Sequence, residues 1–222
     1  MQTNLTDLIF FPGWSFHASI FMMLTPYLAN YHLHFIDVPI QHDNQTLTAL
    51  AHTLPDHAVL AGWSLGGLTA ISLCDMFPDK FRKLILLGST PKFVVDKNWA
   101  GISKTTAHQF YSSARTDFKK TIADFQTLSC LPSHTIKDHL ITHSRHDTDS
   151  LLTQLDFLFQ ADLRDAFINL TQPILSIAGE CDAVLSVTAV REIIPVAGHA
   201  FPFTHAAAVC RRMHQFISSN HA

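Results

Sequence analysis

Ser64 lies in the pentapeptide Gly62-Trp-Ser-Leu-Gly66, which fits the pattern G-x-S-x-G. In that pattern the serine occupies a sharp turn between a strand and a helix, and small residues two positions before and after it prevent backbone clashes. The turn projects the hydroxyl group from the strand end and aims the N–H of Leu65 at a developing oxyanion. The flanking segments fit, because residues 58–61 have the pattern of a buried strand and residues 68–77 that of a helix. We therefore predict that Ser64 is the nucleophile of an acyl-transfer reaction. The alternative is a glycine-rich turn without chemistry.

A serine nucleophile needs a general base, and the base needs a group that orients it. In a parallel sheet both groups should follow the carboxyl ends of later strands. Asp182 comes shortly after a predicted strand at residues 174–178, and His199 comes after one at residues 192–196. The sequence therefore predicts a catalytic triad of Ser64, Asp182 and His199, in that order along the chain.

Two nearby residues compete for these roles. Glu180 also follows the strand at residues 174–178, but Asp182 lies further beyond the strand end and is preferred as the acid. His205 is the alternative base, although we expect it to lie within the closing helix. The chain has 15 histidines, so one histidine alone carries little weight. His199 stands out because it belongs to a Gly-His dipeptide after the last predicted strand.

A second oxyanion donor is expected in the loop after the first strand. That loop covers residues 11–15, where Gly13 permits a close approach of the backbone. We expect the backbone N–H groups of Trp14 and Leu65 to form the oxyanion hole. The Trp14 ring is then free to line a substrate pocket.

Strand-like and helix-like segments alternate along most of the chain. Short apolar runs predict buried strands at residues 8–11, 33–38, 58–61, 84–87, 174–178 and 192–196, and amphipathic spacing predicts helices at 16–30, 47–54, 68–77 and 204–218. Between residues 91 and 165 the pattern is helical only. This predicts an α/β fold with a mostly parallel central sheet of about six strands and helices on both faces. We expect the core to comprise residues 1–90 and 166–222, and residues 91–165 to form a helical cap.

The composition excludes several classes of protein. Hydrophobic residues make up 47% of the 222 residues and charged residues 15%, so a large core is available and global disorder is excluded. The formal net charge of −3 gives no basis for nucleic-acid binding. The first residues lack the pattern of a signal peptide, and no apolar run is long enough to span a membrane. We expect no nucleic-acid or membrane partner, no cofactor, and a monomer.

The cysteines and histidines give no pattern of a metal or redox site. Four cysteines lie far apart and form no C-x-x-C motif, so we expect reduced thiols in a cytoplasmic protein. His139, His143 and His146 have a helical spacing that suits metal binding, but no accompanying carboxylate motif. We therefore expect no metal.

Several further segments carry a resemblance to a known family. They are Pro12-Gly-Trp14, Asp96-Lys-Asn-Trp-Ala-Gly-Ile102, Phe110, Phe125-Gln-Thr-Leu128, Ala161-Asp-Leu-Arg164 and Gly198-His-Ala-Phe-Pro-Phe203. Together with the elbow around Ser64, they make the chain similar to the α/β-hydrolase superfamily and, within it, to the pimeloyl-ACP methyl ester esterases of biotin synthesis. The resemblance covers nearly the whole chain. It implies a cofactor-independent serine carboxylesterase that converts pimeloyl-ACP methyl ester to pimeloyl-ACP and methanol.

The chain also departs from that family. Phe11-Pro12 stands where the first loop usually opens with His-Gly, and Pro39-Ile-Gln-His42 replaces the usual Gly-His-Gly after the second strand. The usual antiparallel strands before the first central strand are not part of the pattern. Asp182 and His199 are only 17 residues apart, close to the minimum for a parallel crossover, so we expect a loop or one helical turn between them.

The predicted cap contains a basic segment. Residues 92–145 hold eight Lys or Arg and four Asp, whereas residues 146–165 hold five Asp and one Arg. A basic face beside the pocket would attract an acidic carrier protein and its phosphopantetheine phosphate. The resemblance places Lys120 and Lys137 where the family carries carrier-binding arginines, and Arg115 joins them as our third candidate for contact with acyl carrier protein. An ordinary solvated helix face is the alternative.

Apolar residues of the predicted cap could line a channel for a seven-carbon acyl chain. Phe110 and Phe125 are the preferred lining residues, and the wider set adds Trp99, Tyr111, Phe118, Leu128 and Phe157. Their helical spacing is equally what packing of the cap itself requires.

Other functions remain open from the sequence. The same triad would serve a hydrolase of free small esters or thioesters, or a related lyase of menaquinone synthesis. A non-catalytic binding protein on a hydrolase fold is disfavoured, because the nucleophile, acid and base all occur in order.

Overall fold

A computed structural model describes residues 5–133, 135–185 and 192–219. Its centre is one six-stranded sheet in the order β2-β1-β3-β4-β5-β6, with every neighbouring pair parallel. The strands are β1 (Thr6–Phe11), β2 (Tyr31–Phe35), β3 (Ala58–Trp63), β4 (Phe81–Leu87), β5 (Ile174–Gly179) and β6 (Glu192–Ile194). The six predicted strands are confirmed, with their ends shifted by a few residues.

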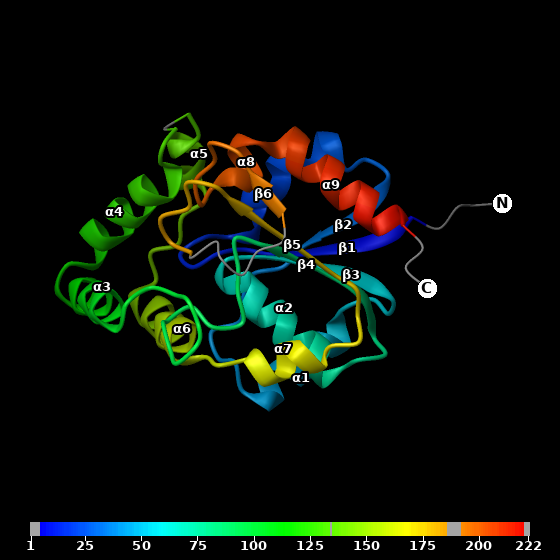
Figure 1. Ribbon diagram of the computed structural model, residues 1–222, viewed down its shortest axis with the longest axis horizontal. Helices are drawn as coiled ribbons and strands as arrows, with labels where there is room; N and C mark the ends of the chain where they lie inside the picture. Colours follow the sequence, from blue (N-terminus) through cyan, green and yellow to red (C-terminus); the bar gives the residue numbers. More distant parts are fainter. Residues whose placement is uncertain (1–4, 134, 186–191, 220–222) are drawn as a thin grey trace.

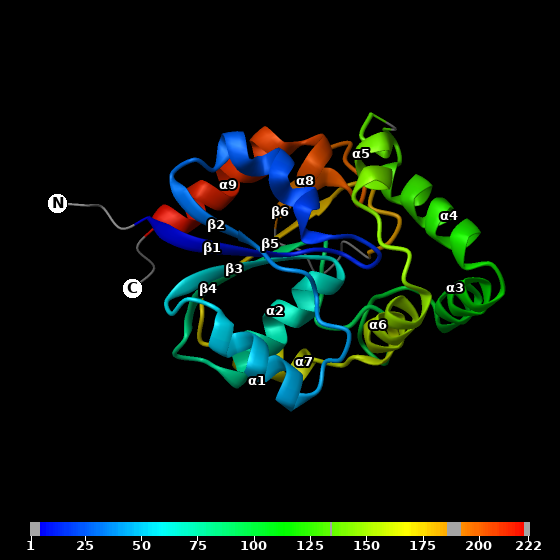
Figure 2. The same ribbon diagram turned by 180° about the vertical axis from the view of Figure 1, so that it is seen from behind.

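Helices cover both faces of the sheet (Figures 1 and 2). One face carries the 3₁₀ helix η1 (Ala18–Tyr27) with α8 (Phe201–Thr204) and α9 (Ala206–Ser218), and the other carries α1 (Asn44–Thr53), α2 (Leu65–Met76) and α7 (Arg164–Asn169). This three-layer arrangement confirms the predicted fold class.

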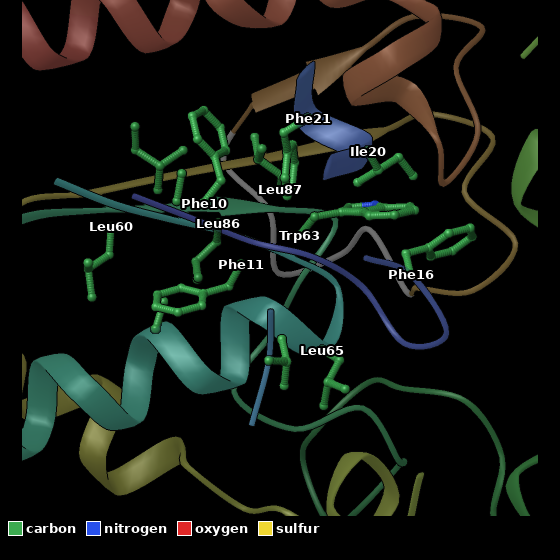
Figure 3. Packing of buried hydrophobic residues seen from close by; sticks show 14 of the residues in the cluster. Phe10, Phe11, Phe16, Ile20, Phe21, Leu60, Trp63, Leu65, Leu86 and Leu87 are labelled. Atoms are coloured by element: carbon green, nitrogen blue, oxygen red, sulfur yellow. The ribbon is translucent and has the colours of Figure 1, made fainter. Parts of the chain in front are cut away.

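In the central strands, apolar side chains point alternately to the two faces of the sheet. Helices cover both faces, so these strands are buried. Every residue of β3 is buried, as expected for a parallel strand with helices on both sides. In β1, Phe10 points toward η1, where its ring centroid lies 4.7 Å from that of Phe21, whereas Phe11 points toward α2 (Figure 3). The core therefore extends through both layers beside the sheet.

A buried lysine ties the sheet to the last helix. The Lys83 ammonium group donates hydrogen bonds to the backbone carbonyls of Phe216, Ile217 and Ser219, at 2.7, 3.1 and 2.7 Å. These carbonyls belong to the last turn of α9 and to its C-cap residue, where helix carbonyls lack partners within the helix and favour a positive charge. Burial lowers the pKa of Lys83 below its usual range.

Four helices gather beyond the carboxyl ends of the strands, on the side of the sheet opposite the chain termini (Figure 1). They are α3 (Lys104–Thr116), α4 (Phe118–Cys130), α5 (Lys137–Thr142) and α6 (Thr148–Gln160). We call them the cap. Each of α3 and α4 begins at a capping side chain: Ser103 accepts a hydrogen bond from the Thr106 N–H, and Asp117 accepts one from the Lys120 N–H.

An ion cluster closes the base of the cap. The Arg164 guanidinium lies 2.9 Å from a carboxylate oxygen of Asp96 and 2.7 Å from one of Asp162, and the Lys92 ammonium lies 2.9 Å from Asp162. Hydrogen bonds from Arg164 hold the pKa of Asp162 well below its usual range. Two of the segments that carried the family resemblance, 96–102 and 161–164, therefore meet where the chain enters and leaves the cap.

Two predicted helices differ from those observed. The helix predicted at residues 16–30 is the shorter η1, which contains Pro26, a residue without a backbone N–H to donate. The helix predicted at 204–218 is divided into α8 and α9, with Pro202 in the first turn of α8 and His205 at the junction.

The predicted loop or helical turn between Asp182 and His199 falls largely on residues 186–191, outside the described residues. Among the described residues, no helix is both long and apolar enough to cross a membrane.

Candidate active site

The backbone at Ser64 has the strained conformation expected of a nucleophile elbow. Its φ is 53° and its ψ is −120°, a conformation that L-residues rarely adopt. The glycines on either side make it possible. A Cβ added to Gly62 would lie 2.3 Å from the Gly66 carbonyl oxygen, and one added to Gly66 would lie 2.1 Å from the Phe11 carbonyl oxygen. The turn can therefore form only with hydrogen at these positions.

Hydrogen bonds from β4 and its following loop hold the elbow in place. The Ser64 N–H donates to the Leu87 carbonyl at 3.0 Å, and the Ser89 hydroxyl donates to the Ser64 carbonyl at 2.7 Å. A Cβ on Gly67 would lie 2.1 Å from Ser89 Oγ, so this contact also requires a glycine. The sequence analysis did not identify Ser89 as a supporting residue, because nothing in its local pattern marks it.

Asp182 and His199 lie together, although 17 residues separate them in the chain. Asp182 Oδ2 lies 2.8 Å from His199 Nδ1, and both side chains are fully buried. The other oxygen, Oδ1, accepts the backbone N–H groups of Val184 and Leu185 at 2.8 and 2.9 Å. These bonds fix the carboxylate, which in turn fixes the plane of the imidazole ring.

Neither competing residue is placed to act in the same way. Glu180 accepts the backbone N–H of Val196 at 2.9 Å, so its carboxylate holds the turn after β6, where Val196 has a positive φ of 55°. His205 lies at the junction of α8 and α9, with its Nδ1 2.8 Å from the Thr204 hydroxyl oxygen.

The second ring nitrogen of His199 is free. Nε2 is buried and has no hydrogen-bond partner among the described residues. The ring lies beside Trp63, with centroids 5.6 Å apart, and the Trp63 Nε1–H donates to the His199 carbonyl at 3.0 Å. A buried, unpaired imidazole nitrogen is costly unless another group uses it. A proton moving to and from Ser64 provides such a use.

Two backbone donors are unpaired near Ser64. Within the described ranges, neither the Trp14 N–H nor the Leu65 N–H donates to a backbone carbonyl or a side chain. Leu65 is the first residue of α2, where N–H groups lack partners within the helix. A Cβ on Gly13 would lie 3.3 Å from the Ser64 Cβ, so the Trp14 loop passes directly over the nucleophile. An oxyanion hole at Trp14 and Leu65, which stays a prediction, requires two such donors beside the nucleophile.

The Trp14 indole is fixed by the cap. Its Nε1–H donates to the Leu151 carbonyl of α6 at 2.8 Å, and the residue is 1% exposed. Its ring packs edge-on against Phe110 and Phe125, each with centroids 5.5 Å away. One residue therefore connects the loop over the nucleophile with three cap helices.

A pocket with about 540 Å³ of empty space, part of it open to solvent, lies between Ser64 and the cap. Its walls are apolar except at Ser64 and Thr106. The lining residues are Trp14, Ser64, Phe93, Ile102, Thr106, Phe110, Phe125, Leu128, Leu155, Leu158, Phe159, Ala183 and Val184. Such a pocket suits an unbranched, uncharged acyl chain.

The predicted lining residues are only partly in this pocket. Phe110, Phe125 and Leu128 line it, whereas Phe118 packs against Trp14 and the Tyr111 hydroxyl donates to Asp156 at 3.2 Å. Trp99 lies at the base of the cap, where its Nε1–H donates to the Lys92 carbonyl.

Helix α6 supplies lining residues that the sequence analysis missed. Leu155, Leu158 and Phe159 line the pocket. Their i, i+3 and i+4 spacing places them on one helix face, and that spacing would have favoured Phe159 over Phe157.

Phe157 instead stacks on His42, a half-buried residue between β2 and α1. The Phe157 and His42 rings are 3.8 Å apart and nearly parallel, at 9°. His42 Nε2 lies 3.0 Å from the Thr69 hydroxyl of α2. Burial lowers the pKa of His42 to about 4, so the ring is neutral at pH 7. His42 therefore joins the nucleophile helix to the cap as an uncharged group.

The loop that carries His199 touches the end of α4. The Ala200 N–H donates to the Ser129 carbonyl at 2.9 Å. A Cβ on Gly198 would lie 1.6 Å from the Leu131 carbonyl oxygen. The cap and the histidine loop are thus in backbone contact.

The basic candidates lie outside the pocket, on the cap helices. Arg115 is in the last turn of α3, Lys120 is in α4, and Lys137 begins α5. None of the three belongs to the pocket lining. Lys120 is 2.5 Å from Asp124, which raises its pKa, whereas Arg115 and Lys137 have no ion pair within the described part of the chain. The structure therefore separates these charges from the reacting groups.

The three histidines weighed as a metal site make other contacts. His139 Nε2 lies 3.0 Å from the Ile20 carbonyl, and His143 Nδ1 lies 2.8 Å from the Ser19 hydroxyl. His139 and His143 therefore hold α5 against η1. Only His139 lies within α5, whereas His143 caps its end and His146 lies beyond it.

Comparisons with known sequences give a consistent family. The family described as alpha/beta hydrolase fold matches residues 26–195. A "Pimeloyl-[acyl-carrier protein] methyl ester esterase" of Vibrio parahaemolyticus is 30% identical, over 91% of this chain and 89% of the relative. A protein of the same name from a Shewanella species is 31% identical, over 87% of this chain and 79% of the relative.

Solved structures give the same fold. An esterase from Exiguobacterium antarcticum superposes with a TM-score of 0.79 at 17% identity, covering 96% of this chain and 92% of the other. A bromoperoxidase from Bacillus anthracis gives a TM-score of 0.80 at 17% identity, with the same coverage. At this identity the likeness concerns the fold alone.

Proposed function

Because the chain belongs to the alpha/beta hydrolase family, we propose that it is a serine carboxylesterase that hydrolyses pimeloyl-ACP methyl ester to pimeloyl-ACP and methanol. The observation that carries this proposal is the similarity, at about 30% identity over most of both chains, to curated esterases of that name. The buried Asp182–His199 pair and the strained Ser64 beside an apolar pocket support it independently.

In the first half of the reaction, Ser64 Oγ attacks the carbonyl carbon of the methyl ester. His199 Nε2 takes the serine proton, and Asp182 keeps the imidazole in the tautomer that leaves Nε2 free. The negative charge that develops on the carbonyl oxygen is met by the backbone N–H groups of Trp14 and Leu65. When the tetrahedral intermediate collapses, the C–O bond to methanol breaks and His199 returns its proton to the departing methoxy oxygen.

In the second half, water replaces methanol. His199 takes a proton from the water as its oxygen attacks the acyl-Ser64 carbonyl, and the same N–H groups stabilise the second oxyanion. The ester bond to Ser64 then breaks, the proton returns to Oγ, and the distal carboxylate of pimeloyl-ACP is released. No cofactor takes part in either half.

Positioning selects the methyl ester over the more reactive thioester. The oxyanion donors act only on a carbonyl that reaches them. In our proposal the phosphopantetheine stays at the pocket mouth and the seven-carbon chain extends along the apolar wall. The distal methyl ester then reaches Ser64 while the thioester remains outside.

We further propose that the carrier protein docks on the outer surface of the cap. Arg115 and Lys137 are the best placed of the predicted basic residues, because neither is engaged in an ion pair among the described residues. Lys120 must exchange its contact with Asp124 for one with the carrier, which an exposed pair permits. We also propose a cytoplasmic, monomeric protein with residues 91–165 as its cap domain; the four free cysteines support a reducing compartment.

The decisive experiment supplies pimeloyl-ACP methyl ester to the purified protein and measures methanol and pimeloyl-ACP. In parallel, the gene is tested for biotin-independent growth in a strain that lacks its own pimeloyl-ACP methyl esterase. We expect stoichiometric methanol, an intact thioester and restored growth, all abolished by Ser64→Ala. Release of holo-carrier protein without methanol would instead identify a thioesterase.

A further inference from the structure

Two histidines and an aspartate converge at the edge of the sheet, far from the triad. His32 and His34 lie on β2, and Asp7 lies on the adjacent strand β1. Asp7 is the register partner of His32, and Ile9 is that of His34. Because side chains alternate along a strand, residues 32 and 34 project from the same face as Asp7.

The donor atoms of the three side chains point at one another. His32 Nδ1 lies 3.0 Å and His34 Nε2 lies 2.6 Å from the same Asp7 oxygen, Oδ1. One ligand atom from each residue lies within 4.8 Å of the other two. The two imidazole rings are tilted against each other, with centroids 4.6 Å apart.

The arrangement holds one imidazole more than an ion pair with Asp7 requires. A single protonated histidine would neutralise Asp7, and a second imidazolium so close to the first would repel it. A neutral imidazole has a nitrogen lone pair that can bind a metal. Two imidazole nitrogens and one carboxylate oxygen form a donor set that Zn²⁺ accepts readily.

The spacing also fits a zinc ion. Zinc–ligand distances of about 2.1 Å place neighbouring ligand atoms of a tetrahedral site about 3.4 Å apart. The two short contacts to Asp7 Oδ1 need to widen by less than about 1 Å to reach that separation. The His32 side chain is 68% exposed and those of Asp7 and His34 about a quarter exposed, so water can reach the fourth position.

We propose that Asp7, His32 and His34 form a zinc-binding site that fastens β2 to β1. In the sheet order β2 is an edge strand, paired with β1 alone. The site lies near the amino end of β1, whereas the loop with Trp14 follows its carboxyl end. Zinc at this position stabilises the sheet edge and takes no part in ester hydrolysis.

The test titrates ZnCl₂ into tag-free, chelator-treated protein at pH 7.5 by calorimetry, with Co²⁺ absorption as a second probe of coordination. We expect one preferred zinc per chain and a thermal midpoint that rises with zinc. His32→Ala/His34→Ala should abolish both, whereas His108→Ala, which removes an exposed cap histidine, should change neither. Hydrolysis of a p-nitrophenyl ester should be the same with and without zinc.

A conservative variant tests the carboxylate. Asp7→Asn keeps the size and a hydrogen-bonding oxygen but removes the charge. It should weaken zinc binding at least about tenfold, because even the loss of a group that only supports a ligand has an effect of that size. Lowering the pH to 5.5 should also weaken binding, because protonated imidazole cannot ligate. Equal zinc affinity in the wild type, the double histidine variant and Asp7→Asn would overturn the proposal. So would the lack of saturable binding to the wild type, or zinc bound without any rise in its thermal midpoint.

Discussion

The two walls of the catalytic pocket are built differently. On the sheet side, backbone packed against backbone sets the position of Ser64, and a Cβ at Gly66 would lie 2.1 Å from a neighbouring carbonyl oxygen. On the cap side, the wall is made of ring contacts such as that between Phe110 and Phe125, with centroids 5.9 Å apart. Backbone contacts of the first kind allow one residue type, whereas apolar volume can be filled by many. The positions that hold the reacting groups therefore each require a particular residue type. The cap wall requires only that its apolar side chains together fill a given shape.

Removing a triad member should have the largest effect on activity, because each reacting group is specified individually. Ser64→Ala and His199→Ala should each lower ester hydrolysis by at least about 10³-fold while the protein stays folded. Asp182→Asn should lose a similar factor, because the tautomer of His199 is no longer fixed. Turnover numbers and circular dichroism spectra of the purified variants provide the check.

Glu180→Gln is the matched control for the acid. It removes a carboxylate two residues from Asp182 that holds the Val196 N–H instead of the imidazole. Its activity should stay within a fewfold of the wild type. A collapse of activity in Glu180→Gln with a mild effect of Asp182→Asn would show that the acid has been misassigned.

His42, which joins helix α2 to the cap, should make stability depend on pH. The folded-state pKa of His42 is lowered to about 4, against about 6.5 in the unfolded chain. Between these values the unfolded state binds the extra proton, so the free energy of unfolding falls as the pH falls. The loss from this residue amounts to at most about 3 kcal/mol, and it is absent above pH 6.5.

Urea unfolding at pH 7 and pH 4.5 measures this effect. In His42→Gln the pH-dependent loss should shrink, because the amide can still reach Thr69 but does not titrate. His52→Gln, at an exposed position of α1, should retain it. An identical pH dependence in the wild type and His42→Gln would contradict the assignment.

The indole of Trp14 should have a smaller effect on rate. Trp14→Phe keeps the backbone N–H over Ser64 but removes the bond to the Leu151 carbonyl. We expect kcat to fall between about three- and tenfold, because a buried carbonyl loses its partner and the donor loop is held less firmly. Trp99→Phe also removes an indole–carbonyl bond, but at the base of the cap, and should leave kcat unchanged. Equal kcat values for the two variants would show that the bond between Trp14 and the cap does not help to position the oxyanion donor.

Salt should give the smallest effect and should act only through the charges on the outer surface of the cap. Raising NaCl from about 0.05 to 0.5 M shortens the range of exposed charges to a few ångströms. The value of kcat/KM for the carrier-bound ester should fall severalfold, and that for a short p-nitrophenyl ester should not change. Parallel salt profiles for the two substrates would argue against docking on the basic cap helices.

The same contrast explains what the sequence could predict. The turn at Ser64, the order of the triad residues along the chain and the pairing of Asp182 with His199 follow from backbone rules. The glycines in these turns mark them in the sequence. The choice between Asp182 and Glu180 needed only their distance from the strand end. Side chains that act across the fold leave no local signal: Ser89, which holds the elbow, belongs to an unremarkable Ser-Thr pair.

The cap was harder to predict because helical spacing alone does not say which neighbour a face meets. Phe157 is one of the wider set of candidate channel residues, but its ring stacks on His42, while Phe159 two residues later lines the pocket. Likewise, three histidines with a helical pattern were weighed as a metal site, whereas Asp7, His32 and His34 come together through strand pairing. The register between β1 and β2 brings these last three residues together, and that register cannot be read from a single sequence.

The backbone contact between the histidine loop and the end of α4 bears on how this enzyme could be re-engineered. Gly198 packs on the Leu131 carbonyl, and the Ala200 N–H depends on the Ser129 carbonyl. Residues 129–131 thus behave as part of the catalytic frame, although they belong to the cap in sequence. A chimera that exchanges the cap for that of a relative should keep these three residues from the host and graft only what precedes and follows them. New substrate ranges are then most accessible through α3 and α6, whose replacement leaves the histidine loop undisturbed.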